Sequence, residues 1–132
     1  MREHTFTIGM DYPGMSLSKN HLWKGGNRRY GMNDEAKQWK SDLANSVRMV
    51  LFIDGILSPG PPVSVQISAR FLDANHAVDL HNLAELVNDA VEEGTGINDR
   101  HFAFSTLQPA YDAHQLPAVW VTVSVSYEGV KA

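Results

Sequence analysis

The chain has 132 residues, of which 43% are hydrophobic and 20% are charged. A chain of this length buries about two-thirds of its unfolded surface, so we expect one globular domain over residues 1–132 and exclude a two-domain enzyme. The absence of cysteine excludes disulfides, thiolate zinc sites and cysteine nucleophiles. The net charge of −4 argues by itself against a nucleic-acid partner, because phosphate contacts dominate that affinity.

The first half of the chain predicts a strand, a loop, a helix and a second strand. Residues 5–9 alternate like a short strand, and the glycine-containing stretch 18–31 is typical of a loop. Asn33 stands where a helix N-cap belongs, and apolar residues recur at helical spacing after it, including Trp39 as a core residue. We expect a helix of about five turns that ends before the proline-rich residues 58–62. Residues 63–71 then alternate as a half-buried strand.

The second half predicts another helix and two more strands. From residue 80 to 93, apolar side chains fill one half of a helix and polar side chains the other. Asp79 is the expected N-cap and Gly94 the expected terminator. Strands follow around Phe102 and Phe104 and over residues 119–126. The order β-α-β-α-β-β predicts an α+β single domain, with two helices packed on a small mixed, mostly antiparallel sheet.

The charges are unevenly distributed along the chain. Residues 12–33, which we call the basic segment, contain no acid but include Lys19, Lys24, Arg28 and Arg29. Residues 79–99 contain six acids and no lysine or arginine. Two interpretations follow: ordinary solvated surfaces, or a basic surface that faces phosphates beside an acidic pocket that holds divalent cations.

The acidic stretch contains the ligand types that magnesium and manganese prefer. Both cations favour hard oxygen ligands from different elements. Asp79 at the start of the second helix and Asp99 before the next strand are candidates, and His81, Glu85 and Asp89 project from one half of that helix. Each aspartate also has a structural explanation, as a cap or as a turn residue. The sequence contains no nucleophile elbow, no phosphate-binding Walker loop and no zinc-binding His-Glu-x-x-His helix.

Three features resemble a known family when they are taken together. They are Ser-Lys-Asn at residues 18–20 before the basic residues, Val-Asp-Leu-His-Asn-Leu at residues 78–83, and the later Asp89 and Asp99. The chain resembles the RusA family of Holliday-junction resolvases. These are small dimeric endodeoxyribonucleases that cut four-way DNA junctions with magnesium or manganese. The resemblance implies a homodimer, branched DNA as substrate, Mg²⁺ or Mn²⁺ as cofactor and no organic cofactor.

The resemblance assigns the family's site residues to the matching motif positions of this chain. Asp79 and Asp99 match catalytic aspartates, His81 stands where a second catalytic aspartate is usual, and Glu85 stands where the family has a lysine. The implied catalytic residues are Asp79, Asp99, His81 and Glu85; the metal ligands are Asp79, Asp99, His81 and Asp89; and the DNA contacts are Lys19, Asn20, Lys24, Arg28 and Arg29.

The departures at His81 and Glu85 leave alternatives open. One alternative is a RusA-like DNA-binding protein whose nuclease activity has lapsed. Another is a protein-interaction or small-molecule module that shares only the fold. His81 has its own alternative as a plain surface histidine. The absence of a membrane-length apolar run and of a secretory signal leads us to expect a cytoplasmic protein without a membrane partner.

Overall fold

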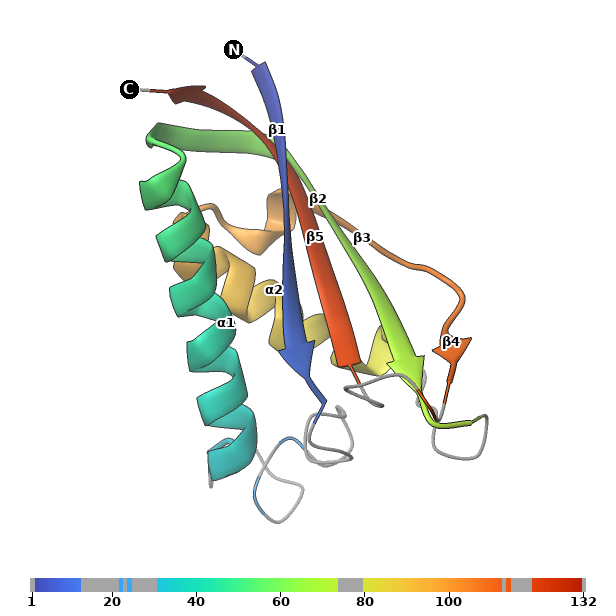
Figure 1. The fold of residues 1–132 in the computed structure, drawn as a ribbon. Coiled ribbons are helices and arrows are strands. Elements are labelled where there is room, and N and C mark those ends of the chain that lie inside the picture. The colour runs from blue at the N-terminus through green and yellow to red at the C-terminus, as the bar shows by residue number, and fades with distance from the viewer. Residues whose placement is uncertain are drawn as a thin grey trace.

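The computed structural model describes residues 2–12, 22, 24, 31–73, 80–112, 114 and 120–131. Within this part of the chain, both α-helices lie on the same side of one sheet (Figure 1). The elements in chain order are β1 (Arg2–Asp11), α1 (Asp34–Ile53), β2 (Ile56–Phe71), the 3₁₀ turn η5 (Leu80–Leu83), α2 (Ala84–Thr95), the 3₁₀ turn η6 (Asp99–His101), β3 (Phe102–Thr106), β4 (Ala110–Tyr111) and β5 (Trp120–Lys131).

The sheet is mixed and mostly antiparallel. Its strand order is β1-β5-β2-β3, and the short β4 also pairs with β2. β5 runs antiparallel to both of its neighbours, whereas β3 and β4 run parallel to β2. The connection from β2 through α2 to β3 is the helical crossover that parallel strands require. The expected α+β class, with two helices on a mixed sheet, is confirmed.

The first helix begins where the sequence predicts. The side chain of Asn33 caps it by accepting a hydrogen bond from the backbone N–H of Ala36 at 2.8 Å. Trp39 is 5% exposed, and its indole N–H donates to the carbonyl of Asp11 at 2.7 Å. Trp39 is therefore a core residue that also joins α1 to the end of β1.

The proline-rich residues 58–62 lie within a strand, so the prediction that β2 begins at Val63 was wrong. β2 starts at Ile56 and pairs with β5 along most of its length, with register shifts on either side of residues 58–60. β3 pairs with β2 only from Val63 onward. Among the described residues, no strand pairs with the proline stretch on that side. Edge or bulged positions of this kind tolerate a missing N–H donor.

The second helix differs from the prediction at both ends. It starts with the 3₁₀ turn η5, and α2 proper begins at Ala84, while Asp79 lies outside the described residues. Gly94 does not terminate it: α2 continues to Thr95, and Gly96 supplies the left-handed C-cap with φ of 77°. A Cβ on Gly94 would lie 2.6 Å from Cβ of Val47, so this glycine allows α1 and α2 to approach closely.

The C-terminal part contains one strand that was not predicted and one that is longer than predicted. β4 has only two residues, Ala110 and Tyr111. β5 continues past Ser126 to Lys131, since β1 pairs with it as far as Gly129. Val119, the expected first residue of this strand, lies outside the described residues.

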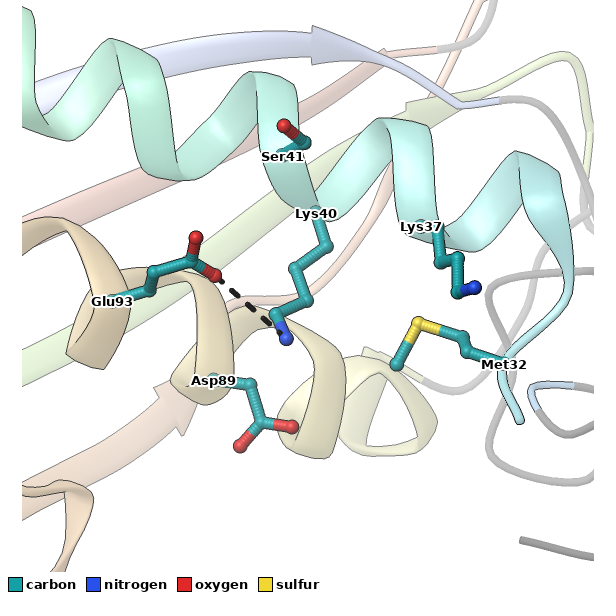
Figure 2. A pocket seen from close by; sticks show the side chains of 6 residues that line it. All are labelled: Met32, Lys37, Lys40, Ser41, Asp89 and Glu93. Carbon is teal, nitrogen blue, oxygen red and sulfur yellow. Dashed lines mark ion pairs between the residues drawn. The ribbon is translucent and has the colours of Figure 1, made fainter. Parts of the chain in front are cut away.

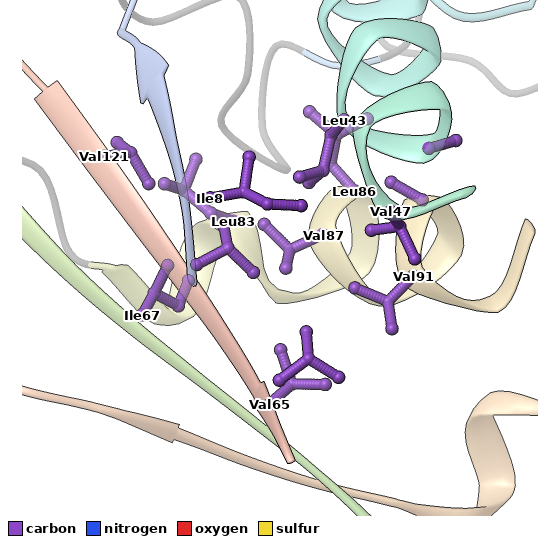
Figure 3. Packing of buried hydrophobic residues seen from close by; sticks show 14 of the residues in the cluster. Ile8, Leu43, Val47, Val65, Ile67, Leu83, Leu86, Val87, Val91 and Val121 are labelled. Carbon is purple, nitrogen blue, oxygen red and sulfur yellow. The ribbon is translucent and has the colours of Figure 1, made fainter. Parts of the chain in front are cut away.

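The core fills the space between the two helices and the sheet. Apolar side chains from every layer interlock there (Figure 3), including Ile8, Leu43, Ile67, Val87 and Val121. The alternation in β2 and β5 and the apolar half of α2 are thus confirmed. No helix in the described part of the chain combines the length and the apolar character that crossing a membrane requires.

Candidate functional site

Three carboxylates converge where α2 ends and β3 begins. Asp89 and Glu92 lie on α2, and Asp99 is the first residue of η6. One carboxylate oxygen from each lies within 4.8 Å of those of the other two. Asp89 and Glu92 are partly buried and Asp99 is exposed. We call these three residues the acidic group.

Local structure explains this convergence. Asp89 and Glu92 are three residues apart, which places them on one face of a helix. The chain reverses at Gly96, and the Asn98 side chain then caps η6 by accepting from the N–H of Arg100 at 3.0 Å. The backbone N–H of Asp99 donates to Oε1 of Glu92 at 3.2 Å.

Electrostatic crowding perturbs one member of the acidic group. Burial is the main cause that raises the pKa of the Asp89 carboxyl. The ammonium of Lys40 acts in the opposite direction, and the carboxylates of Glu85, Asp99 and Glu92 raise this pKa further. Like charges held at this distance favour either a shared proton or a bound cation.

A pocket of about 420 Å³ opens between α1 and α2 beside the acidic group. Lys40 of α1 reaches toward the carboxylates of α2 across it, whereas Lys37 lies beside Met32 (Figure 2). Nζ of Lys40 lies 3.8 Å from Oε2 of Glu93. We call this the interhelix pocket; its lining residues are Met32, Lys37, Lys40, Ser41, Asp89 and Glu93.

The structure brings together some of the predicted ligands and separates others. Asp89 and Asp99 are together in the acidic group, and Glu85 is near enough to affect the pKa of Asp89. His81 is not in the group: its Nε2 lies 3.4 Å from Oγ1 of Thr106, at the end of β3, and its ring packs beside Phe104. Asp99 lies just before β3, whereas His81 lies at the far end of this strand. Because a five-residue strand spans roughly 17 Å, the two residues are at opposite ends of it.

Asp79 lies outside the described residues, so its predicted place beside Asp99 stays a prediction. The same holds for four of the five predicted DNA contacts, namely Lys19, Asn20, Arg28 and Arg29.

Lys24 is the predicted DNA contact that the structure describes. Its side chain is half exposed, and its ammonium nitrogen lies 3.5 Å from a carboxylate oxygen of Asp34. The neighbouring Leu22 is fully buried, and its carbonyl accepts hydrogen bonds from both the backbone and the side chain of Asn33. These contacts hold part of the basic segment against the start of α1.

Two residues of the site were not predicted from the sequence. Glu92 belongs to the acidic group, and its spacing of three from Asp89 on the polar half of α2 was an available signal. Lys40 had no such signal, because it reaches Asp89 and Glu93 only through the packing of α1 on α2.

The acidic group fits a hard divalent cation. It supplies three carboxylates from two elements, which is the donor type that Mg²⁺ and Mn²⁺ prefer. Exposure at Asp99 leaves room for water and for a substrate oxygen to complete the coordination.

Comparisons with known proteins add little to this geometry. No family model and no curated protein matches the chain. Among solved structures, it is similar to 2C-methyl-D-erythritol 2,4-cyclodiphosphate synthase from Plasmodium vivax, with a TM-score of 0.40 and 12% sequence identity. The match covers 73% of this chain and 58% of the synthase. A likeness at this level carries no argument about activity.

Proposed function

We propose that this chain is a divalent-metal-dependent endodeoxyribonuclease that resolves four-way junctions or other branched DNA in recombination and repair. The observation that carries the proposal is the convergence of Asp89 and Asp99, two residues of the RusA-like motif, with Glu92. Three neighbouring carboxylates at a solvent-accessible site are the donor set that a metal-dependent nuclease needs.

In this proposal, Asp89, Glu92 and Asp99 hold the metal, and Glu92 also fixes the backbone at Asp99. A bound divalent cation would supply Lewis-acid activation of water and stabilisation of charge on the leaving oxygen. The basic segment contacts backbone phosphates, which positions DNA without reading its bases. Asp79 and His81 stay predictions from the resemblance.

The proposed substrate also bears on assembly and location. A junction is cut symmetrically by two active sites, so we infer a homodimer whose two-fold axis matches that of the junction. We also infer a cytoplasmic location for the protein.

A second candidate function is a RusA-like DNA-binding protein that no longer cuts. The favouring observations are Glu85 at the expected lysine position and the location of His81 beside Thr106, away from the acidic group. Such a protein would bind junctions with a steep salt dependence, but would cleave none with any divalent cation.

Cleavage of a synthetic four-way junction in Mn²⁺ or Mg²⁺ tests the two candidates. We expect Asp99→Asn and Asp89→Asn to abolish cutting. Asp42→Asn is the matched control, because Asp42 lines a separate acidic pocket of about 440 Å³ on α1. Unchanged cutting by the Asp99 variant would reject the assigned site. Binding without cutting by the wild type would favour the second candidate, and neither binding nor cutting would favour an interaction module.

A further inference from the structure

The interhelix pocket presents two cations on one face of α1. Lys37 and Lys40 are three residues apart, so their side chains can reach the same ligand. Lys37 is exposed and makes no ion pair with any other residue that the structure describes. Among the described residues, Lys40 pairs with Glu93 at a distance of 3.8 Å between Nζ and Oε2, which is long enough for a ligand oxygen to compete.

The opposite wall of the pocket is acidic. Asp89 and Glu93 of α2 line it on the side that Lys40 reaches (Figure 2), and Asp89 also belongs to the acidic group. An anion without a bound cation would meet two carboxylates as well as two ammonium groups, so the net electrostatic attraction would be small. An anion that shares a divalent cation with Asp89 converts this repulsion into attraction.

The pocket also adjoins the basic segment. Met32, the residue before the Asn33 cap, lines the pocket, and the backbone N–H of Lys24 donates to the carbonyl of Gly31. The described end of the basic segment, at Met32, therefore lies at the same pocket as Lys37 and Lys40.

We propose that the interhelix pocket binds a metal-chelated phosphate group, with Lys37 and Lys40 on the phosphate oxygens and Asp89 on the shared divalent cation. The assignment to DNA rests on the proposed function: the phosphate would then belong to a nucleotide beside the cut. A free diphosphate presents the same chemistry, and the two sources are separated by experiment.

The first test uses inorganic pyrophosphate on the full chain, with amide chemical shifts as the readout. We expect saturable shifts at Lys37, Lys40 and Asp89 when Mg²⁺ is present, and none with pyrophosphate alone. The double variant Lys37→Met and Lys40→Met keeps the apolar stems but removes both charges, so affinity should fall about tenfold or more. Arg70→Met is the control, because Arg70 lies on β2 between the buried Ala69 and Phe71 and does not line the pocket, so its loss should leave affinity unchanged.

The second test measures junction binding in Ca²⁺ as salt is varied. Each lysine variant should reduce the slope of log affinity against log salt by about one, which a purely structural role would not do. Absence of Mg²⁺-dependent pyrophosphate binding, or equal binding by the double variant, would overturn the pocket proposal even if junctions are cut. Pyrophosphate binding by a protein that neither binds nor cuts junctions would support the pocket and reject the proposed DNA function.

Discussion

The carboxylate of Glu92 accepts a hydrogen bond from the backbone N–H of Asp99 at 3.2 Å, so the last turns of α2 hold the start of η6 in place. Glu92 therefore has two separable roles, as a charge in the acidic group and as an acceptor that positions Asp99. Glutamine retains an oxygen acceptor but not the charge, whereas alanine retains neither.

Loss of a residue that hydrogen-bonds to a metal ligand typically weakens metal binding roughly 10- to 100-fold. We expect Glu92→Gln to weaken Mn²⁺ binding by at least this factor. Glu92→Ala should weaken it further, because Asp99 also loses its tether. Isothermal titration of Mn²⁺ into each purified variant measures the difference. Equal affinities for the wild type and Glu92→Ala would place the metal elsewhere.

Metal binding should also appear as thermal stabilisation. At a free Mn²⁺ concentration of 100 times its Kd, a ligand that binds only the folded protein adds about 2.7 kcal/mol to the free energy of unfolding. We expect thermal denaturation to show this gain in the wild type and in Asp42→Asn, and to show most of it lost in Asp99→Asn. A gain of the same size in the Asp99 variant would contradict the site.

The raised pKa of Asp89 predicts a pH dependence of stability without metal. The folded protein holds this proton more tightly than the unfolded chain, so the free energy of unfolding falls as pH rises from about 3.8 through the raised pKa. Asp89→Asn removes this pH-dependent fall in the free energy of unfolding. At pH 7 in a chelator, we expect the variant to be more stable than the wild type by up to about 1 kcal/mol, a small effect because solvent screens the partly exposed group.

Denaturant unfolding of both proteins between pH 3 and pH 8 provides the measurement. The two curves should converge at the acid end, where Asp89 is protonated in either state, and separate as pH rises. With saturating Mn²⁺ the order at pH 7 should reverse, because only the wild type retains the Asp89 ligand. A less stable Asn variant at pH 7 without metal would show that the attraction of Lys40 outweighs burial and crowding.

Local patterns predicted the elements and part of the site. The Asn33 cap, the apolar half of α2 and the alternation in β5 depend on neighbours in sequence, and each is confirmed. Asp89 and Asp99 were predicted as ligands from their place in a motif, and a single chain reversal at Gly96 is enough to bring them together.

Features that depend on contacts distant in sequence were not predicted. Lys40 joins the site because α1 packs on α2, and no spacing within either helix indicates that contact. The strand through Pro61 depends on pairing with β5 and on the late start of β3. Gly94 was taken for a terminator because glycine ends helices often, whereas here it permits close helix packing.

That packing gives a test of the fold itself. At Gly94, a Cβ would lie 2.6 Å from Cβ of Val47 and 2.9 Å from the carbonyl oxygen of Ala44, neither of which is the end of a flexible side chain. Overpacking of this kind costs about 1–3 kcal/mol, which equals or exceeds the roughly 1 kcal/mol that alanine gains over glycine inside a helix. We therefore expect Gly94→Ala to lower the free energy of unfolding by up to about 2 kcal/mol.

Two other glycines separate the steric cost at Gly94 from backbone effects. Gly96→Ala meets no atom within 4 Å, so its loss of about 1 kcal/mol should come from the positive φ alone. Gly60→Ala finds its nearest neighbour at 3.9 Å and has no positive φ, so its stability should stay within about 0.5 kcal/mol of the wild type. Urea denaturation of the three variants measures the ranking. If Gly94→Ala were as stable as Gly60→Ala, the close approach of α1 and α2 would be wrong, and with it the width of the interhelix pocket.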